Sequence, residues 1–224
     1  VAGYVGTGGT IALKRDQSVR IVDIPSETKY CVTQADVAGY TLESVSGEQG
    51  AIRAGDSHVS RAEFVNVYAS KGTVDVSAVK VLQDGKQSAG QYAFSLCSID
   101  EGTGKRTPIR SGYNDKNGKV VFGLLRYNEG DSGKTFRYVI VEKEGKRPGV
   151  EYSKGEITVT VKVTDNGDGT MTGDLSYAGG DGTDEQKAES TSPKQLINIY
   201  RASGQTSLVA WKSLKNGELQ KDQF

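Results

Sequence analysis

Two residue types that could react with each other recur at one fixed spacing in this chain. Lys80 and Lys212 are separated by 132 positions, and so are Asn66 and Asn198. A lysine amine is a nucleophile only when it is neutral, and its ordinary pKa near 10.4 keeps it charged at neutral pH. Burial disfavours the charged form and lowers that pKa. These lysines can therefore act as nucleophiles at neutral pH only if the fold buries them.

The residues around them repeat as well, which indicates an array of modules. The stretch TVDVSAVKVLQDGKQSAGQYAFSL at 73–96 returns in part as LVAWKSLKNGELQKDQF at 208–224, and FVNVY at 64–68 returns as LINIY at 196–200. One offset shared by two separate motifs is the signature of repeated domains. We expect modules that begin on a lysine-bearing strand and end on an asparagine-bearing one. The expected parts are an incomplete module at 1–70, a complete module at 71–202, and the opening strand of a further module at 203–224.

The composition favours strands and gives no sign of a nucleic-acid or membrane partner. The 224 residues include 29 glycines and 11 tyrosines, and valine and threonine, which suit strands, are frequent. The 28 basic and 28 acidic residues balance, so no charge excess attracts nucleic acid or an anionic membrane. No apolar run approaches the roughly 18 residues that would span a bilayer. Cys31 and Cys97 fall in different modules, so we expect no disulfide framework and a buried free thiol at Cys31.

Short alternating segments separated by turn residues predict an all-β protein built from tandem antiparallel β-sandwiches. The Asn-Gly pairs at 117–118 and 166–167 are hairpin signals, and the second is a better match to a turn than to a calcium loop. The polar segment Ala178–Lys194 is predicted to be a mobile surface loop. Strands are expected at 18–24, 29–34, 39–42 and 62–68, with a short one inside 47–58, and then at 74–82, 91–99, 119–124, 135–142, 157–164, 171–177 and 195–200.

The second module resembles a known family. AVKVL around Lys80, TFRYVIVEKEGKRPGVEY around Glu142, VTVKVTDNGDGTMTGDLSY and the closing LINIY with Asn198 together resemble the B-type and T-antigen-like pilin domains of Gram-positive surface proteins, which carry isopeptide cross-links. The resemblance covers about 73–200. It implies reverse immunoglobulin-like sandwiches and an autocatalytic bond between Lys80 and Asn198, with Glu142 as the catalytic acid.

The physical requirements for such a bond can be stated separately. Burial between two sheets would lower the pKa of Lys80 and raise that of Glu142, which leaves a neutral amine and a protonated acid. The acid could then donate a hydrogen bond to the Asn198 carboxamide oxygen and shuttle a proton to departing ammonia. Lys80 and Asn198 each share strand parity with apolar neighbours, so both could face the core.

The first module resembles the same domains but departs from their pattern at the acid. SVRIVDIPSETKYCVTQADVAGY and AEFVNVY carry the resemblance, and Gln34 stands where the family's acid is expected. An amide cannot transfer a proton as a carboxylic acid does, although it could hydrogen-bond Asn66. We also consider that residues 203–224 are donated to this module, within the chain or from a neighbouring molecule. Lys212 would then approach Asn66; the alternative is a disordered stub.

The function expected from these features is structural. The first hypothesis is a stalk module of a Gram-positive pilus or cell-wall adhesin, outside the cell, that contacts neighbouring modules or pilin subunits and self-cross-links once rather than turning over a substrate. The alternative is an adhesin domain that binds a host protein or glycan. A hydrolase with an accessory sandwich is poorly supported, because His58 is the single histidine and no metal or cofactor motif is visible.

Overall fold

The structure is a computed structural model that describes residues 8–55, 59–218 and 220–222. It divides into two compact units. The first takes the described residues up to Thr73 together with Arg126–Lys134 and Val163–Gly173. The second takes Val74–Leu125, Thr135–Lys162 and the described residues from Asp174 onward. The domain boundaries expected from the repeat stay a prediction.

Among the described residues of the first unit, β1 to β4 form two short antiparallel ribbons. One pairs β1 (Lys29–Cys31) with β3 (Gln49–Ala51), and the other pairs β2 (Tyr40–Ser46) with β4 (Glu63–Tyr68). These four strands fall where alternation placed them. The strand expected at 18–24 is wrong, because no strand forms there and its apolar side chains Val19, Ile21 and Val22 are exposed.

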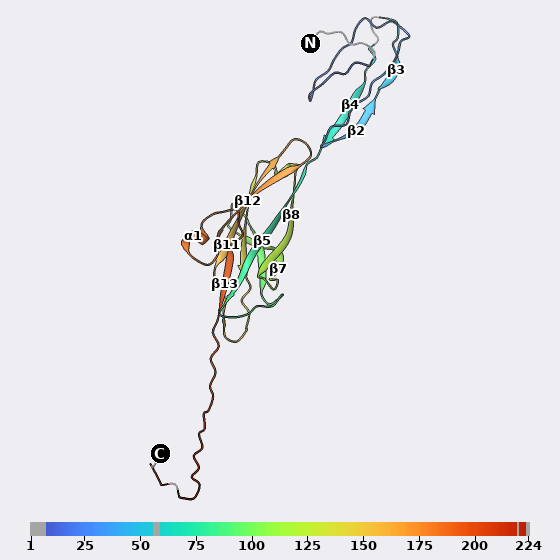
Figure 1. The fold of residues 1–224 in the computed structure, drawn as a ribbon. Helices are drawn as coiled ribbons and strands as arrows, with labels where there is room; N and C mark the ends of the chain where they lie inside the picture. The colour runs from blue at the N-terminus through green and yellow to red at the C-terminus, as the bar shows by residue number, and fades with distance from the viewer. Residues whose placement is uncertain (1–7, 56–58, 219, 223–224) are drawn as a thin grey trace. The chain divides into compact units, whose positions relative to one another are not determined.

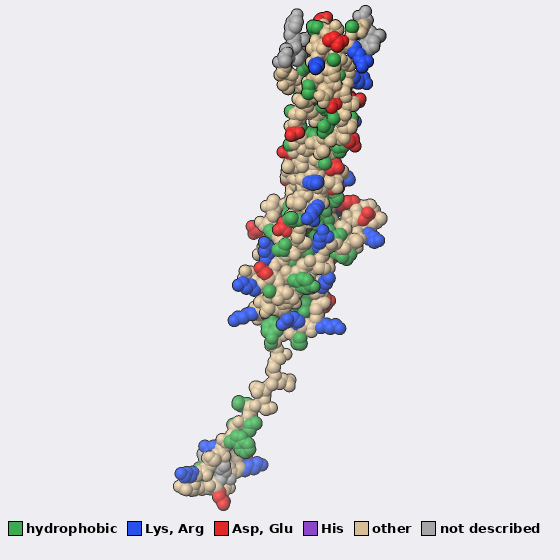
Figure 2. Space-filling model, turned by 90° about the vertical axis from the view of Figure 1, so that its right-hand side faces the viewer, with side chains coloured by type: hydrophobic (Ala, Val, Ile, Leu, Met, Phe, Trp, Pro, Cys, Tyr) green, Lys and Arg blue, Asp and Glu red, His purple; other side chains and the backbone are tan. Residues whose placement is uncertain are grey.

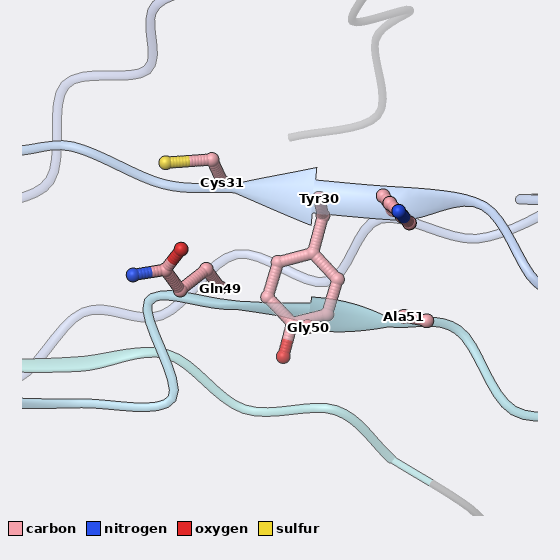
Figure 3. A pocket seen from close by; sticks show the side chains of 6 residues that line it. Tyr30, Cys31, Gln49, Gly50 and Ala51 are labelled. Carbon is pink, nitrogen blue, oxygen red and sulfur yellow. The ribbon is translucent and has the colours of Figure 1, made fainter.

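Figure 3 shows the surface of the first ribbon, where the Tyr30 ring lies over Gly50. A Cβ atom at Gly50 would come within 3.0 Å of the Tyr30 hydroxyl, so glycine leaves room for the ring. Cys31, on the same ribbon, is a free and exposed thiol. The expectation of a buried Cys31 is therefore wrong, since a three-residue strand paired on one side leaves its side chains accessible. His58 lies outside the described residues.

Asp165 organises a second cluster within the first unit. Its carboxylate accepts hydrogen bonds from the Tyr68 hydroxyl (2.5 Å), the Ser70 hydroxyl (2.8 Å) and the Gly167 N–H (2.8 Å). These bonds, led by the one from Tyr68, lower the pKa of Asp165. The Asn166 N–H donates to the Thr170 carbonyl, which confirms the hairpin turn expected at this Asn-Gly pair.

Two facing sheets form the β-sandwich and supply most of the second unit (Figure 1). The core between them consists of alternating apolar side chains, of which Val76, Phe94, Leu96, Ile140 and Val159 are fully buried. This confirms the all-β sandwich. One sheet has the order β10-β13-β5-β8, with β5 (Lys71–Gln83), β8 (Lys119–Asn128), β10 (Val150–Glu151) and β13 (Gln195–Tyr200). The other has the order β12-β11-β9-β6-β7, with β6 (Ala93–Ile99), β7 (Arg106–Tyr113), β9 (Thr135–Glu142), β11 (Glu156–Asp165) and β12 (Met171–Gly179).

The first and last strands of the sandwich are neighbours and run in the same direction. β13 pairs with β5 in parallel, with Leu196 opposite Lys80 and Asn198 opposite Leu82. This pair departs from the antiparallel pairing expected throughout. Parallel neighbours need a long crossover connection, and here almost the whole domain provides it. The lysine-bearing and asparagine-bearing strands therefore lie side by side.

The alternation pattern did not predict four of the elements. β7 is an edge strand with few apolar residues. Its Pro108 lies opposite Cys97 beside a bulge, and an edge strand tolerates the missing N–H of a proline there. β10 has two residues. The single helical turns η1 (Glu129–Asp131) and α1 (Asp184–Lys187) are too short to show a period.

The segment Ala178–Lys194, expected to be a mobile loop, is tied to the sandwich. The Gly180 N–H donates to the Glu156 carbonyl (2.7 Å), and the Asp181 N–H donates to the Gln195 carbonyl (2.8 Å). α1 follows, with a capping box formed by Thr183 and Gln186. A loop was expected because the segment is polar and low in complexity, whereas these backbone hydrogen bonds hold its start against β11 and β13.

The described residues after Tyr200 form no strand. Leu208 and Trp211 are 96% and 93% exposed, and hydrophobic side chains lie along this segment in Figure 2. The opening strand of a further module, and its donation to the first module, stay predictions. Across the described residues, no helix has the length and apolar character needed to cross a membrane.

Candidate isopeptide site

Lys80 is buried in the sandwich core because it continues the inward-facing row of β5. Val76 and Ala78 precede it on the same face, and Lys80 itself is 1% exposed. Its Nζ donates hydrogen bonds to Glu142 Oε2 (2.9 Å) and to the Leu196 carbonyl (3.1 Å). The same nitrogen lies 5.0 Å from the centre of the Tyr92 ring. A lysine in this position loses its water and depends on these contacts.

Glu142 joins the lysine to the asparagine. It is the last residue of β9, and its side chain is 1% exposed. While Oε2 accepts from Lys80, Oε1 accepts from Asn198 Nδ2 at 2.8 Å. One carboxyl group therefore contacts the amine through one oxygen and the carboxamide nitrogen through the other.

Asn198 completes the cluster from β13, where it is fully buried. Its Oδ1 accepts a hydrogen bond from the Ser153 backbone N–H at 2.8 Å. The expected bond from Glu142 to the carboxamide oxygen is therefore not what the structure shows. Glu142 instead lies on the nitrogen side of the carboxamide, and a backbone donor serves the oxygen.

The electrostatics of the pair favour neutral forms. Burial lowers the pKa of Lys80, and the hydrogen bond and charge of Glu142 oppose this only in part. Burial likewise raises the pKa of Glu142 against the opposing effect of Lys80. Both shifts favour transfer of the shared proton from nitrogen to oxygen, which yields an uncharged amine beside a protonated acid.

Two residues next to the site were missed by the sequence reasoning. The Asp181 carboxylate accepts from the Ser153 hydroxyl and, at 2.7 Å, from the Ile197 N–H. Ser153 lies in the loop between β10 and β11, and Asp181 lies in the segment after β12. The one available signal was the AGGDG sequence at 178–182, in a segment that was interpreted as a loop because it is polar and low in complexity.

The first unit has a different cluster at the corresponding asparagine. Gln34 Nε2 donates to Asn66 Oδ1 at 2.8 Å, and Asn66 Nδ2 donates back to Gln34 Oε1 at 2.9 Å. Both side chains are solvent-exposed. The hydrogen bond considered between these two amides is confirmed. Lys212 lies in the strandless segment after Tyr200.

Comparison with known families agrees with this geometry. Residues 76–201 match the FctA family, described as a Spy0128-like isopeptide-containing domain. The match covers more than half of the chain and includes Lys80, Glu142 and Asn198.

The chain belongs to this family. It therefore carries a structural domain of the Gram-positive pilin type. Residues 2–68 match a second family, a domain of unknown function (DUF7601). A search of curated proteins returned no match.

Proposed function

We propose that Lys80 and Asn198 form an intramolecular isopeptide bond and that Glu142 catalyses it once, after folding. The observation that carries the proposal is the bridging carboxyl group. Glu142 contacts the Lys80 amine through Oε2 and the Asn198 amide nitrogen through Oε1, with all three side chains removed from solvent. Membership of an isopeptide-containing family supports the same chemistry.

The contacts suggest how protons move. The neutral amine of Lys80 attacks the Asn198 carboxamide carbon, and the amide nitrogen becomes amine-like in the tetrahedral intermediate. Glu142 gives the proton it holds to that nitrogen, which lies beside Oε1, and the carboxylate so formed takes a proton from the cationic Lys80 nitrogen at Oε2. The old C–N bond breaks, ammonia leaves, and the acid is regenerated. Amine plus carboxamide thus becomes a secondary amide plus ammonia, and no cofactor takes part.

The fold supplies the remaining catalytic contribution. β5 and β13 hold the two reactants on adjacent strands at a fixed register. Correct positioning of two groups can replace a very high effective concentration. An amide bond also becomes favourable here because ammonia diffuses away, whereas the amine stays fixed.

The cross-link would make this domain a stalk module that resists tension. It would join the first and last strands and close a loop from residue 80 to residue 198. By the chain-entropy estimate used for disulfides, this stabilises the folded state by about 5 kcal/mol. A force that enters through β5 and leaves through β13 would pass through covalent bonds. We propose the wall-attached surface of a Gram-positive cell as the setting and neighbouring modules or pilin subunits as the partners.

A bond between Lys212 and Asn66, with Gln34 at the acid position, remains a separate prediction. It requires residues 203–224 to be donated to the first module of the same or a neighbouring chain. Within one chain, such a bond would remove a second ammonia. Between chains, it would give a covalent dimer.

The intact mass of the folded protein tests the proposal. We expect the wild-type mass to fall below the sequence mass by one ammonia, and the Asn198→Ala chain to have its full sequence mass. A wild-type protein at full sequence mass would overturn the proposal.

Mechanical pulling tests the stalk role. In the wild type, the residues between Lys80 and Asn198 should contribute no extension. The Asn198→Ala chain should release them when its sandwich unfolds. Equal extension of the two proteins would contradict a load-bearing cross-link.

A further inference from the structure

We propose that the Ser153 backbone N–H is the oxyanion donor for bond formation and that Asp181 is the residue that positions it. This inference rests on the proposed Lys80–Asn198 bond. It assigns a role to two loops that hold no reacting group. The first observation is that the Ser153 N–H donates a hydrogen bond to the carboxamide oxygen of Asn198 (2.8 Å).

The attack of the amine places negative charge on this oxygen. The C=O double bond of Asn198 opens as Lys80 adds to the carbon, and its electron pair moves to Oδ1. A donor already aimed at that atom stabilises the charge without having to reorganise. Glu142 is engaged on the nitrogen side of the carboxamide. The backbone donor and the acid therefore act on opposite ends of the same group.

Hydrogen bonds of the Asp181 carboxylate to Ser153 and Ile197, which we call the clamp, fix the direction of this donor. The carboxylate oxygen Oδ2 accepts from the Ser153 hydroxyl and from the Ile197 N–H. The Ser153 hydroxyl oxygen in turn accepts from the Gly155 N–H (3.0 Å). Ile197 directly precedes Asn198 on β13. One carboxylate oxygen therefore ties the donor loop to the strand that carries the reactant.

Three glycines allow the clamp to close. Gly179 and Gly180 have φ values of 82° and 83°, and a Cβ atom on either would lie 2.5–2.6 Å from a backbone carbonyl oxygen of Glu156 or Gln195. A Cβ at Gly155 would lie 2.5 Å from the Asp181 carboxylate. The left-handed backbone at 179–180 and the lack of a side chain at Gly155 thus let Asp181 approach Ser153. A side chain at any of these three positions would block that approach.

The rate of cross-linking tests this assignment. The full chain is made by cell-free synthesis, quenched in denaturant at timed intervals, and weighed intact, so that loss of ammonia reports the bond. Ser153→Pro removes the N–H and should slow the reaction by about 100-fold. Ser153→Ala keeps the N–H and loses the hydroxyl, and Asp181→Ala opens the clamp. Both should slow the reaction by roughly tenfold through misplacement of the donor.

Asp181→Asn separates positioning from charge. An amide oxygen can accept both hydrogen bonds that Oδ2 now accepts, so this variant should react at close to the wild-type rate with an unchanged pH profile. If Asp181 acted instead through its charge on Glu142, Asp181→Asn would be as slow as Asp181→Ala and its pH profile would shift. That result would overturn the positioning role. Asp174→Ala, at an exposed aspartate of β12, is the matched control and should have no effect.

Folding is checked in the Asn198→Ala background, where no bond can form. Each variant should keep its circular dichroism spectrum there, so that a lower rate reports chemistry rather than unfolding. If Ser153→Pro fails this check, the comparison of the Asp181→Ala and Asp181→Asn rates tests the proposal instead. Wild-type protein that never loses ammonia would remove the proposed bond and this inference together. Wild-type protein that loses it, with Asp181→Ala equally fast, would overturn this inference alone.

Discussion

The two asparagines of the repeated motifs FVNVY and LINIY, Asn66 and Asn198, have opposite surroundings. Asn198 is fully buried and shares a carboxyl group with a buried lysine. Asn66 is exposed and exchanges two hydrogen bonds with the amide of Gln34. The same side chain, 132 positions apart, thus lies against a buried carboxyl group in one unit and is half of a neutral amide pair in the other.

The difference comes from burial and from the carboxyl group of Glu142, where the first unit has the amide of Gln34. In the second unit, loss of water shifts the pKa of Lys80 down and that of Glu142 up, which makes proton exchange between them possible. In the first unit, two amides satisfy each other but neither can give up a proton. Under the proposed chemistry, an asparagine therefore needs a buried acid beside it in order to cross-link.

The largest effect is expected when the second site is made to resemble the first. Glu142→Gln replaces the acid by an amide, so the chain should keep its full sequence mass. Without the cross-link the free energy of unfolding should fall by about 5 kcal/mol, which corresponds to roughly 10–20 °C in Tm for a protein of this size. Differential scanning calorimetry and intact mass measure the two effects.

Glu144→Gln is the matched control, because Glu144 lies two residues further on with a side chain that is 68% exposed. It should keep both the ammonia loss and the wild-type Tm. A Glu142→Gln chain that still loses ammonia would show that the acid is not required.

A smaller effect should appear when the acid is kept and its lysine is removed. In the Lys80→Met chain, no bond forms, and burial holds the pKa of Glu142 above its ordinary value of 4.5. Because the folded state then favours the protonated form, its stabilisation is complete below about pH 4.5 and is lost as pH rises through the folded-state pKa. The loss amounts to about 1.4 kcal/mol for each pH unit that separates the folded-state pKa from the unfolded-state pKa. Thermal unfolding should therefore give a higher Tm at about pH 4 than at about pH 8.

Two controls define that result. The Lys80→Met, Glu142→Gln double variant should lose this pH dependence, since no titrating acid remains at the site. Lys154→Met changes a lysine whose side chain is 74% exposed and should leave the cross-linked protein unchanged. An equal Tm at both pH values in Lys80→Met would contradict the raised pKa of Glu142.

The smallest effect is expected when the first site is made to resemble the second. Gln34→Glu places an acid beside Asn66, but both side chains are in water. We expect no additional loss of ammonia and a change in unfolding free energy of at most about 1 kcal/mol from the altered hydrogen bonds. Intact mass and thermal unfolding measure both. A further ammonia lost from Gln34→Glu would show that an acid suffices without burial.

Alternation and repetition predicted much of this architecture, and the failures have physical causes. The inward row of β5 placed Lys80 in the core, because period-two burial is a local property of the strand. The direction of β13 beside β5 was not predictable in this way, since strand pairing depends on the path of the whole domain. The contacts of Ser153 and Asp181 were missed for the same reason: they join two loops that are distant in sequence and that only the path of the whole domain brings together.

A tryptic peptide map tests most directly whether Lys80 and Asn198 are covalently joined. A joined lysine resists trypsin, so residues 72–86 should remain uncut at Lys80 and appear bound to 195–201, as one branched peptide whose mass is lower by one ammonia. Fragmentation should place the branch at Lys80 and Asn198. Separate linear peptides 72–80, 81–86 and 195–201, with Asn198 intact, would contradict the account.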